Sequence, residues 1–186
     1  RVSNPERVEA PTCNTAPLQI STRAVLFAGR RYPFTARHCY HSAIELRAAD
    51  PDRFEHNLSI LGDALLQAAP SKSLAFLLDR QRRKNLRAGF ERAYAAQIER
   101  GVRQVFHGRL LEGIRRLKGC GVGLTPGGDD FIAGLLIGLH VQPKLRGQDF
   151  QPTIDAVFRA ARGRNIFSNT FLDLARRGLA SGPMRD

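Results

Sequence analysis

Residues 119–130, Gly-Cys-Gly-Val-Gly-Leu-Thr-Pro-Gly-Gly-Asp-Asp, constrain this chain more than any other stretch. Five glycines, a threonine, a proline and two adjacent carboxylates lie between an arginine-rich helical pattern and an apolar one. Packing alone does not explain this composition, because glycines add no side chain to a core and carboxylates are costly to bury. We expect the rest of the chain to be a scaffold that presents this loop.

Two familiar glycine-rich loops do not fit the spacing. Gly119, Gly121 and Gly123 alternate, as in a dinucleotide-binding turn, but that fingerprint requires a preceding strand and G-x-G-x-x-G spacing. Here the preceding pattern is helical and the third glycine comes one place early. A Walker A loop is also excluded, because the stretch contains no Gly-Lys-Ser/Thr.

The loop nevertheless has the features of an anion site. Gly121, Gly123, Gly127 and Gly128 can turn their backbone N–H groups toward a bound atom, since no Cβ is in the way. Thr125 followed by a proline predicts an N-cap and a first helical residue. The positive end of the next helix would then lie at the loop and attract anions.

Asp129 and Asp130 limit what can bind, because two carboxylates repel a bare phosphate. Three roles are open. The pair could hold a divalent cation such as Mg²⁺ that bridges to the anion. It could accept hydrogen bonds from an amide or amino group of a substrate. Alternatively, one carboxylate could cap loop N–H groups while the other pairs with an arginine.

The motif Gly121-x-Gly-Leu-Thr-Pro-x-Gly-Asp-Asp130, followed by an apolar helix that contains glycines, resembles the signature of the oxamate carbamoyltransferase subunit family. The resemblance is close over residues 110–139 and weaker over residues 164–178, and residues 1–80 carry none. It implies a subunit of an enzyme that moves a carbamoyl group between oxamate and phosphate, in allantoin-derived nitrogen metabolism.

The resemblance also suggests which residues carry the function. We predict Asp129, Asp130 and Thr125 as catalytic residues, with the two aspartates as tentative metal ligands, and the four glycines of the anion site as backbone donors. Ser168 and Asn169, in the weaker block, are further substrate-binding candidates.

Two departures separate the chain from the family pattern. Gly127 stands where the family usually has a serine, and Asn165-Ile166 stands where two threonines are expected. A hydroxyl that could bond an anion is therefore absent. A non-catalytic regulatory or assembly subunit, with the loop as an interface element, is the alternative function.

The formal net charge of +12 invites anionic partners, nucleic acid among them. The 29 basic residues comprise 25 arginines and four lysines, spread along the chain without a basic tail. We therefore rank a small anionic substrate above a nucleic-acid-binding module, and expect association with other enzyme subunits or with further copies. The cluster Arg80-Gln-Arg-Arg-Lys84 with Arg87 is interpreted first as a solvated helix face and second as an anion-facing patch near the loop.

The remaining composition favours a cytoplasmic protein without a membrane span. No apolar run approaches the ~20 residues needed to cross a bilayer. The three cysteines are odd in number and widely spaced, which argues against a disulfide framework or a zinc site. His38 and His41 beside Cys39 could form a metal pair, but partly buried polar aromatics near a helix start are the favoured interpretation.

The patterning predicts an α+β fold, in which a small β-containing N-terminal portion packs on a larger, mainly helical region. Residues 1–17 are expected to form a mobile arm, residues 18–56 the β-containing portion and residues 57–186 the helices. We expect one structural domain, shortened relative to the family.

The predicted elements are two strands joined through a turn at residues 29–31, a turn at residues 50–52 and a series of helices. Glycines and prolines punctuate the helical periods, and the first expected helix ends at Pro70. A second starts at Leu74 and continues through an i+4 row that includes Tyr94 and Ile98 to Gly101. A third has the apolar row Val102, Phe106, Leu110, Ile114 and Leu117 and runs straight into Gly119, and later helices end before Pro143, at Gly163 and at Gly178. Residues 143–149 are expected to be a charged connector. Gly134 and Gly138, four apart, predict a close helix crossing.

Overall fold

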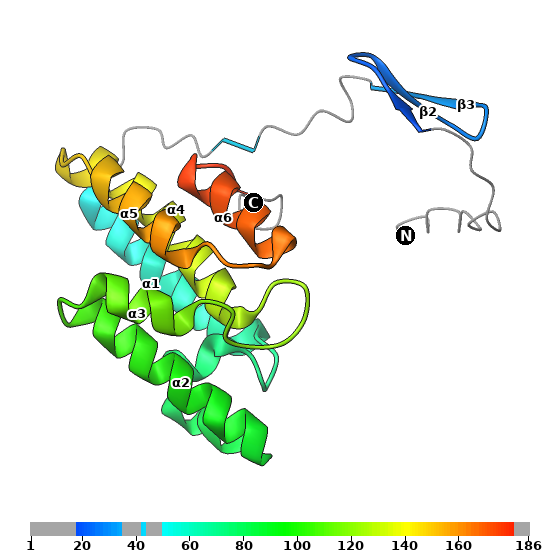
Figure 1. The fold of residues 1–186 in the computed structure, drawn as a ribbon. Helices are drawn as coiled ribbons and strands as arrows, with labels where there is room; N and C mark the ends of the chain where they lie inside the picture. Colours follow the sequence, from blue (N-terminus) through cyan, green and yellow to red (C-terminus); the bar gives the residue numbers. More distant parts are fainter. Residues whose placement is uncertain (1–17, 35–41, 44–49, 181–186) are drawn as a thin grey trace. The chain divides into compact units, whose positions relative to one another are not determined.

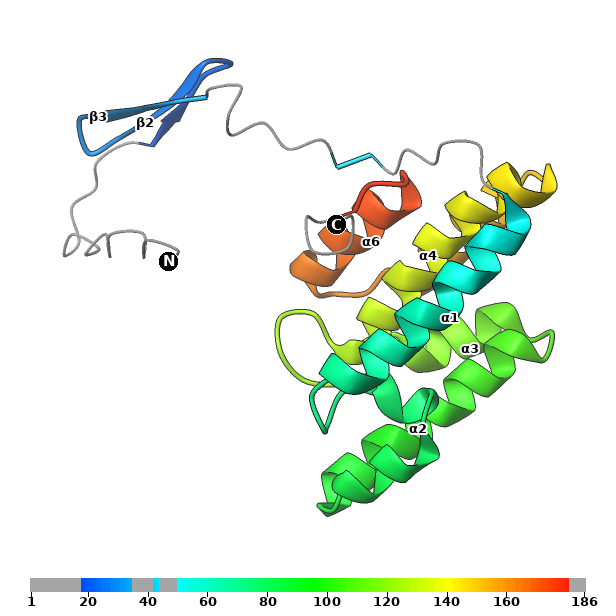
Figure 2. The same ribbon diagram turned by 180° about the vertical axis from the view of Figure 1, so that it is seen from behind.

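The computed structural model describes residues 18–34, 42–43 and 50–180 (Figure 1), and Figure 2 shows the same chain from behind. The described residues divide into a first unit that carries a β-sheet and a second unit, from Ser42 onward, that carries the helices. The expected α+β class, with the glycine-rich loop between two helices, is confirmed. The packing of the two portions on each other and the domain limits stay predictions. The 1–17 arm and the histidine pair lie outside the described residues.

The sheet has three antiparallel strands in the order β1-β2-β3, one more than the sequence predicted. The strands are β1 (Gln19–Ile20), β2 (Ala24–Phe27) and β3 (Arg30–Pro33). The predicted turn at residues 29–31 is wrong, because Ala28 and Gly29 form the turn with φ of 50° and 73°. Two-residue hairpins require this pair of positive φ angles, so Arg30 already pairs with Phe27.

The second unit is helical throughout. Its elements are α1 (Pro51–Ala68), η2 (Leu74–Leu77), η3 (Arg80–Asn85), α2 (Gly89–Phe106), α3 (Leu110–Leu117), α4 (Gly127–Arg146), α5 (Gln151–Ala161) and α6 (Ile166–Arg176), where η denotes a 3₁₀ helix. In this unit α3 packs on α2, α4 and α5, and α4 also packs on α5 and α6 (Figure 1). No helix in the described part of the chain is long and apolar enough to cross a membrane.

The first helix starts where a turn was expected. The Asp50 side chain accepts a hydrogen bond from Asp52 N at 3.0 Å, and Pro51 occupies the first helical position. An acidic N-cap followed by a proline is typical of a helix start. The predicted turn at residues 50–52 is therefore wrong. The predicted end at Pro70 is confirmed, since α1 ends at Ala68.

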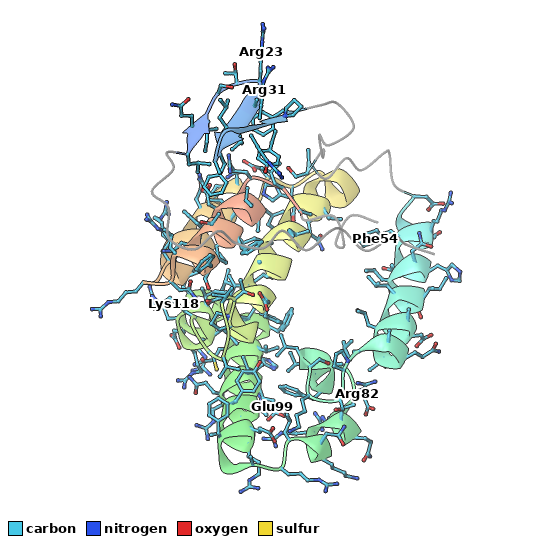
Figure 3. All side chains as sticks on the ribbon, turned by 90° about the vertical axis from the view of Figure 1, so that its right-hand side faces the viewer. Arg23, Arg31, Phe54, Arg82, Glu99 and Lys118 are labelled. Carbon is cyan, nitrogen blue, oxygen red and sulfur yellow. The ribbon has the colours of Figure 1, made fainter. Side chains whose placement is uncertain are left out.

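Helix α1 has an exposed apolar stripe. Leu58, Leu61 and Leu65 are each about half exposed, at 49%, 52% and 47%. α1 is not packed along its length on any other helix, and Figure 3 shows it set apart from the α2–α4 body. The Arg82 guanidinium, labelled in Figure 3, holds the C-terminal end of α1 by donating to Leu66 O and, at 3.0 Å, to Ala69 O.

The predicted helix between Leu74 and Gly101 is wrong at both ends. Two 3₁₀ turns, η2 and η3, precede α2, which begins only at Gly89 and runs through Gly101 to Phe106. Gly101 does not cap a helix, because its φ is not positive. The continuous helix predicted from Val102 into Gly119 is also wrong, because the chain turns between α2 and α3. That turn uses Gly108, whose φ is 79°, as a glycine following a helix end commonly does.

Glycine serves close packing at the contact between α2 and α3. A Cβ on Gly101 would lie 2.6 Å from Leu117 Cγ, and a Cβ on Gly113 would lie 2.6 Å from Gly101 O. The two helix backbones therefore approach each other through paired glycines. The close crossing predicted at Gly134 and Gly138 is not seen among the described residues, since a Cβ at either would meet nothing within 4 Å.

Helix α4 is the central element of the unit. It continues to Arg146, so the predicted connector at residues 143–149 is wrong over its first half. Gly134 and Gly138 line an apolar groove of about 680 Å³ on one side of the helix, beside Phe131 and Leu135. The largest fully buried side chains of the core come from α2 to α6 and are Ile98, Ile114, Leu117, Ile132, Leu136, Ile154, Val157 and Leu172.

Replacing Gly113 should test the α2–α3 contact. Gly113→Ala places a methyl group against backbone, which cannot move aside easily, so we expect a loss of about 1–3 kcal/mol in unfolding free energy. Gly134→Ala is the matched control, because it adds the same methyl group to open space in a helix and should stabilise by about 0.5–1 kcal/mol. Urea unfolding followed by circular dichroism measures both. Equal stabilities for the two variants would contradict the close contact.

Candidate functional site

Positive φ angles shape the connection between α3 and α4. Gly119, Gly121 and Gly123 have φ of 67°, 130° and 96°, which other residues rarely adopt. The turn starts where Cys120 N donates to Leu117 O at 2.9 Å. The alternating glycines noted in the sequence are thus required by backbone conformation.

The end of the loop returns against its beginning. Gly128 N donates to Cys120 O at 2.8 Å, and a Cβ on Gly128 would collide with Leu117 O. A Cβ on Gly121 would lie 2.8 Å from Gly127 N. No side chain fits at Gly121 or Gly128 unless the backbone shifts, so these two glycines close the loop.

Helix α4 begins one residue later than predicted. Its first residue is Gly127, and the carbonyl of Pro126 accepts hydrogen bonds from Asp129 N at 2.8 Å and Asp130 N at 3.1 Å. Pro126 is therefore in the N-cap position that was predicted for Thr125. The positive end of α4 still lies at the loop, as expected.

The two aspartates have different environments. Asp129 is only 5% exposed, and its Oδ1 accepts a hydrogen bond from Gly119 N at 2.7 Å. One of the three roles open from the sequence, a carboxylate that caps a loop N–H, is thus seen for Asp129. Asp130 lies at the surface. Although the two aspartates are adjacent on α4, the carboxylate of Asp129 is buried and has a structural role, whereas that of Asp130 is exposed.

The surroundings of the exposed Asp130 raise the pKa of its carboxyl group. Crowding by neighbouring protein atoms removes part of the hydration of Asp130 and raises the pKa of its carboxyl, and the charge of Asp129 raises it further. A hydrogen bond from the Thr125 side chain acts in the opposite direction. Thr125 and Asp130, both predicted site residues, are therefore brought together.

Tyr94 and Cys120 also belong to this site, and sequence reasoning missed both. Burial raises the pKa of the Tyr94 phenol, and the charges of Cys120 and Asp130 add to the effect. Burial likewise raises the pKa of the Cys120 thiol, with a contribution from Asp129. Tyr94 lay in an i+4 apolar row of α2 and was assigned to the core, and nothing in its spacing indicated the loop.

Tyr94 also accounts for one departure from the family pattern. A Cβ on Gly127 would collide with the Tyr94 hydroxyl, so a serine at this position requires that hydroxyl to move. The glycine at position 127 and the placement of Tyr94 are therefore coupled. The phenol oxygen lies where a serine side chain would otherwise start.

A second helix N-terminus meets the loop. Asn165 is the N-cap of α6, and its Oδ1 accepts hydrogen bonds from Phe167 N at 3.0 Å and Ser168 N at 3.3 Å. Its Nδ2 donates to Leu124 O at 2.7 Å. Asn165 was noted only as a departure from the family pattern, although an asparagine before a helical period is a strong N-cap signal that could have identified this role.

The two further candidates, Ser168 and Asn169, differ in their partners. Ser168 is 4% exposed, and within the described residues its Oγ has no hydrogen-bond partner. Asn169 donates to Gly163 O and accepts from Gly163 N, both at 3.0 Å, so its amide holds the turn before α6. Substrate contact by either residue stays a prediction.

Three of the four predicted backbone donors remain available. Gly128 N is used by Cys120 O, but in the described part of the chain Gly121 N, Gly123 N and Gly127 N donate to no protein acceptor. The described residues contain no group of three His, Cys, Asp or Glu side chains that could hold a metal ion. A metal held by the two aspartates alone stays a prediction.

The electrostatic coupling at the site can be tested by titrating Tyr94. Its raised pKa means that the folded protein binds more protons than the unfolded chain above the usual tyrosine value of about 10, so stability should fall as the pH rises through that region. Asp130→Asn removes a nearby negative charge and should lower the Tyr94 pKa, while the exposed Asp63→Asn should not. Carbon-13 NMR of ring-labelled tyrosine measures the titration, and identical curves for all three proteins would contradict the coupling.

The bridge from α6 to the loop gives a second prediction. Asn165→Asp keeps the carbonyl oxygen that caps α6 but loses the donor to Leu124 O. We expect little change in overall stability but faster hydrogen exchange at the loop amides. Asn165→Ala loses both roles and should cost about 0.5–2 kcal/mol. Unchanged loop exchange in Asn165→Asp would show that the bridge does not order the loop.

Comparison with known proteins finds a family model that is similar to the loop region. A family model described as oxamate carbamoyltransferase subunit AllH matches residues 117–186, which comprise the end of α3, the loop and α4 to α6. No curated protein and no solved structure matched the sequence. The matched region contains every site residue described above except Tyr94. Residues 117–186 of this chain are therefore similar to the oxamate carbamoyltransferase subunit family.

Proposed function

We propose that this chain is a subunit of a carbamoyltransferase-like enzyme and that its loop at residues 119–130 binds a small anionic substrate of the oxamate or carbamoyl phosphate type. The family match supports the class of enzyme. The loop supports the class of ligand. Association with other enzyme subunits is part of the proposal, because the family is described as a subunit.

One observation carries the proposal. The unpartnered N–H groups of Gly121, Gly123 and Gly127 lie in the segment where the N-termini of α4 and α6 meet, joined by the hydrogen bond from Asn165 to Leu124 O at 2.7 Å. Helix N-termini and free backbone N–H groups both favour negative charge. Helix α4 has 20 residues and helix α6 has 11 residues, and both have their N-termini at this loop. The fields of their helix dipoles therefore add there.

The exposed carboxylate of Asp130 narrows the ligand class. A bare phosphate beside it would be repelled, whereas an anion that also carries an amide can donate its N–H to the carboxylate. Oxamate and carbamoyl phosphate both combine an anionic group with an amide. The carboxylate of Asp129 is already engaged with Gly119 N, so Asp130 is the one left for this contact.

Carbamoyl transfer gives each of these groups a role. When the substrate nitrogen attacks the carbamoyl carbon, negative charge develops on the carbonyl oxygen and on the phosphate that leaves. Preorganised N–H donors stabilise such charge without reorganising during the reaction. In this assignment Thr125 orients Asp130, Tyr94 adds a neutral donor beside it, and the loop N–H groups bind the anion.

A non-catalytic role in assembly remains the second candidate, and one observation favours it. Val122 and Leu124 are 72% and 67% exposed at the tip of the loop, and Ile166 at the start of α6 is 72% exposed. Three apolar side chains beside the candidate site would be covered by a partner subunit. Ligand binding without turnover until a partner is added would favour this role.

Calorimetry with carbamoyl phosphate and with oxamate tests the proposal, each with and without Mg²⁺. We expect the wild-type chain to bind at least one of them and Asp130→Asn to weaken binding about tenfold or more, as for the loss of a hydrogen bond to a charged group. Asp63→Asn, an exposed carboxylate on α1, should bind like the wild type. Asp129→Asn tests the metal role. A metal ligand predicts a larger loss of affinity with Mg²⁺ than without it, whereas loss of the bond from Gly119 N alone predicts the same loss in both conditions.

No binding in any combination, including with candidate partner subunits present, would refute the proposed function. Equal weakening by Asp130→Asn and Asp63→Asn would also count against it, because the effect would then not be specific to the carboxylate at the loop.

A further inference from the structure

Positive charge gathers around a hollow whose lining includes no residue of the loop at 119–130. A hollow of about 480 Å³ is lined by Arg80, Arg83, Lys84, Arg87 and Arg92, with the buried Leu86 among its lining residues. These residues come from η3, from the connection to α2 and from the first turn of α2. Five cations and no carboxylate therefore surround one concavity.

The 3₁₀ geometry of η3 places part of the lining of this hollow in one row. A 3₁₀ helix has three residues per turn, so side chains three apart lie in one row. Arg80 and Arg83 are three apart within η3, and Leu86 follows three residues later at its C-cap. The Asp79 side chain starts this helix by accepting a hydrogen bond from Gln81 N at 2.8 Å.

The acidic residues nearby neutralise very little of this charge. Glu99, labelled in Figure 3, pairs with Arg83 at 2.6 Å. Glu91 is engaged elsewhere, by Lys72 and by the backbone N–H groups at the start of α2. Among the described residues, Arg80, Lys84, Arg87 and Arg92 form no ion pair with a carboxylate; Arg92 donates to a backbone carbonyl and Lys84 to a glutamine side chain.

We propose that this hollow is a second binding site and that it takes a small ligand with a chain of two or three phosphates. Gathering cations is unfavourable unless a counter-charge is supplied, and among the described residues four of these five have no carboxylate partner. Guanidinium groups bind phosphate oxygens through paired N–H donors. The volume lies in the range of about 300–1,000 Å³ that small-molecule sites occupy, which is more than a single phosphate needs.

Calorimetric titration of the full chain with inorganic tripolyphosphate, at constant ionic strength, tests this site. Arg80→Ala combined with Arg87→Ala should raise the dissociation constant at least about tenfold, because charge-assisted hydrogen bonds from two cations are lost. The control is Arg100→Ala combined with Arg103→Ala. It removes the same charge from exposed positions of α2 outside the hollow and should leave the dissociation constant within about twofold.

Two further proteins sharpen the result. Arg80→Lys combined with Arg87→Lys keeps the charge but loses the paired donors, so its affinity should fall between those of the wild type and the alanine pair. The alanine pair should bind oxamate like the wild type, which separates this site from the one proposed at the loop. Thermal unfolding of each variant confirms that its fold is retained.

The proposal fails if tripolyphosphate does not bind, if orthophosphate binds equally well, or if both alanine pairs lose affinity equally. It also fails if a single-stranded RNA oligomer binds more tightly than tripolyphosphate and is weakened by both pairs alike. In that last case the positive charge would form a nucleic-acid surface with no localised site.

Discussion

The candidate site depends on the hydrogen bond from Gly119 N to the buried carboxylate of Asp129. It joins the second residue after α3 to the first turn of α4 across the loop. Beside it, Gly128 lies against Leu117 O so closely that no side chain fits. A buried carboxylate is costly unless it is paired with donors, so this bond is needed both to place the loop and to keep Asp129 satisfied. The exposed Asp130, the free N–H groups and the meeting of α4 with α6 all follow from that closure.

Much of the fold could be predicted from the sequence because the helical periods reflect burial. Ile98, Ile114 and Leu117 lie in the predicted apolar rows and are fully buried. The predictions that proved wrong concern residue types that occur in two different structural roles. Gly101 was interpreted as a helix end, but it serves a close contact with α3, and the two uses look alike in one sequence. Phe106 continued an apolar row and is 69% exposed, because α2 ends there.

The candidate site also contains features that the sequence predicts and features that it does not. Local features of the loop were accessible, since positive φ at alternating glycines and a helix start after proline are encoded within a few residues. Contributions from distant segments were not. Tyr94 lies 26 positions before Cys120 in the sequence, and Asn165 reaches Leu124 across 41 positions. Only the packing of α2 on α3 and of α6 on α4 brings them to the loop, and no periodicity in one sequence reports that packing.

The central claim is that the backbone N–H groups of the loop bind a small amide-bearing anion. The most direct measurement is the amide proton chemical shift of Gly121, Gly123 and Gly127 in nitrogen-15 NMR spectra during titration with carbamoyl phosphate or oxamate. The account predicts saturable downfield shifts at these glycines, as hydrogen bonds to an anion form, with smaller changes at Gly128, whose N–H is already bonded to Cys120 O. Saturation with ligand that leaves these three amides unchanged would contradict it.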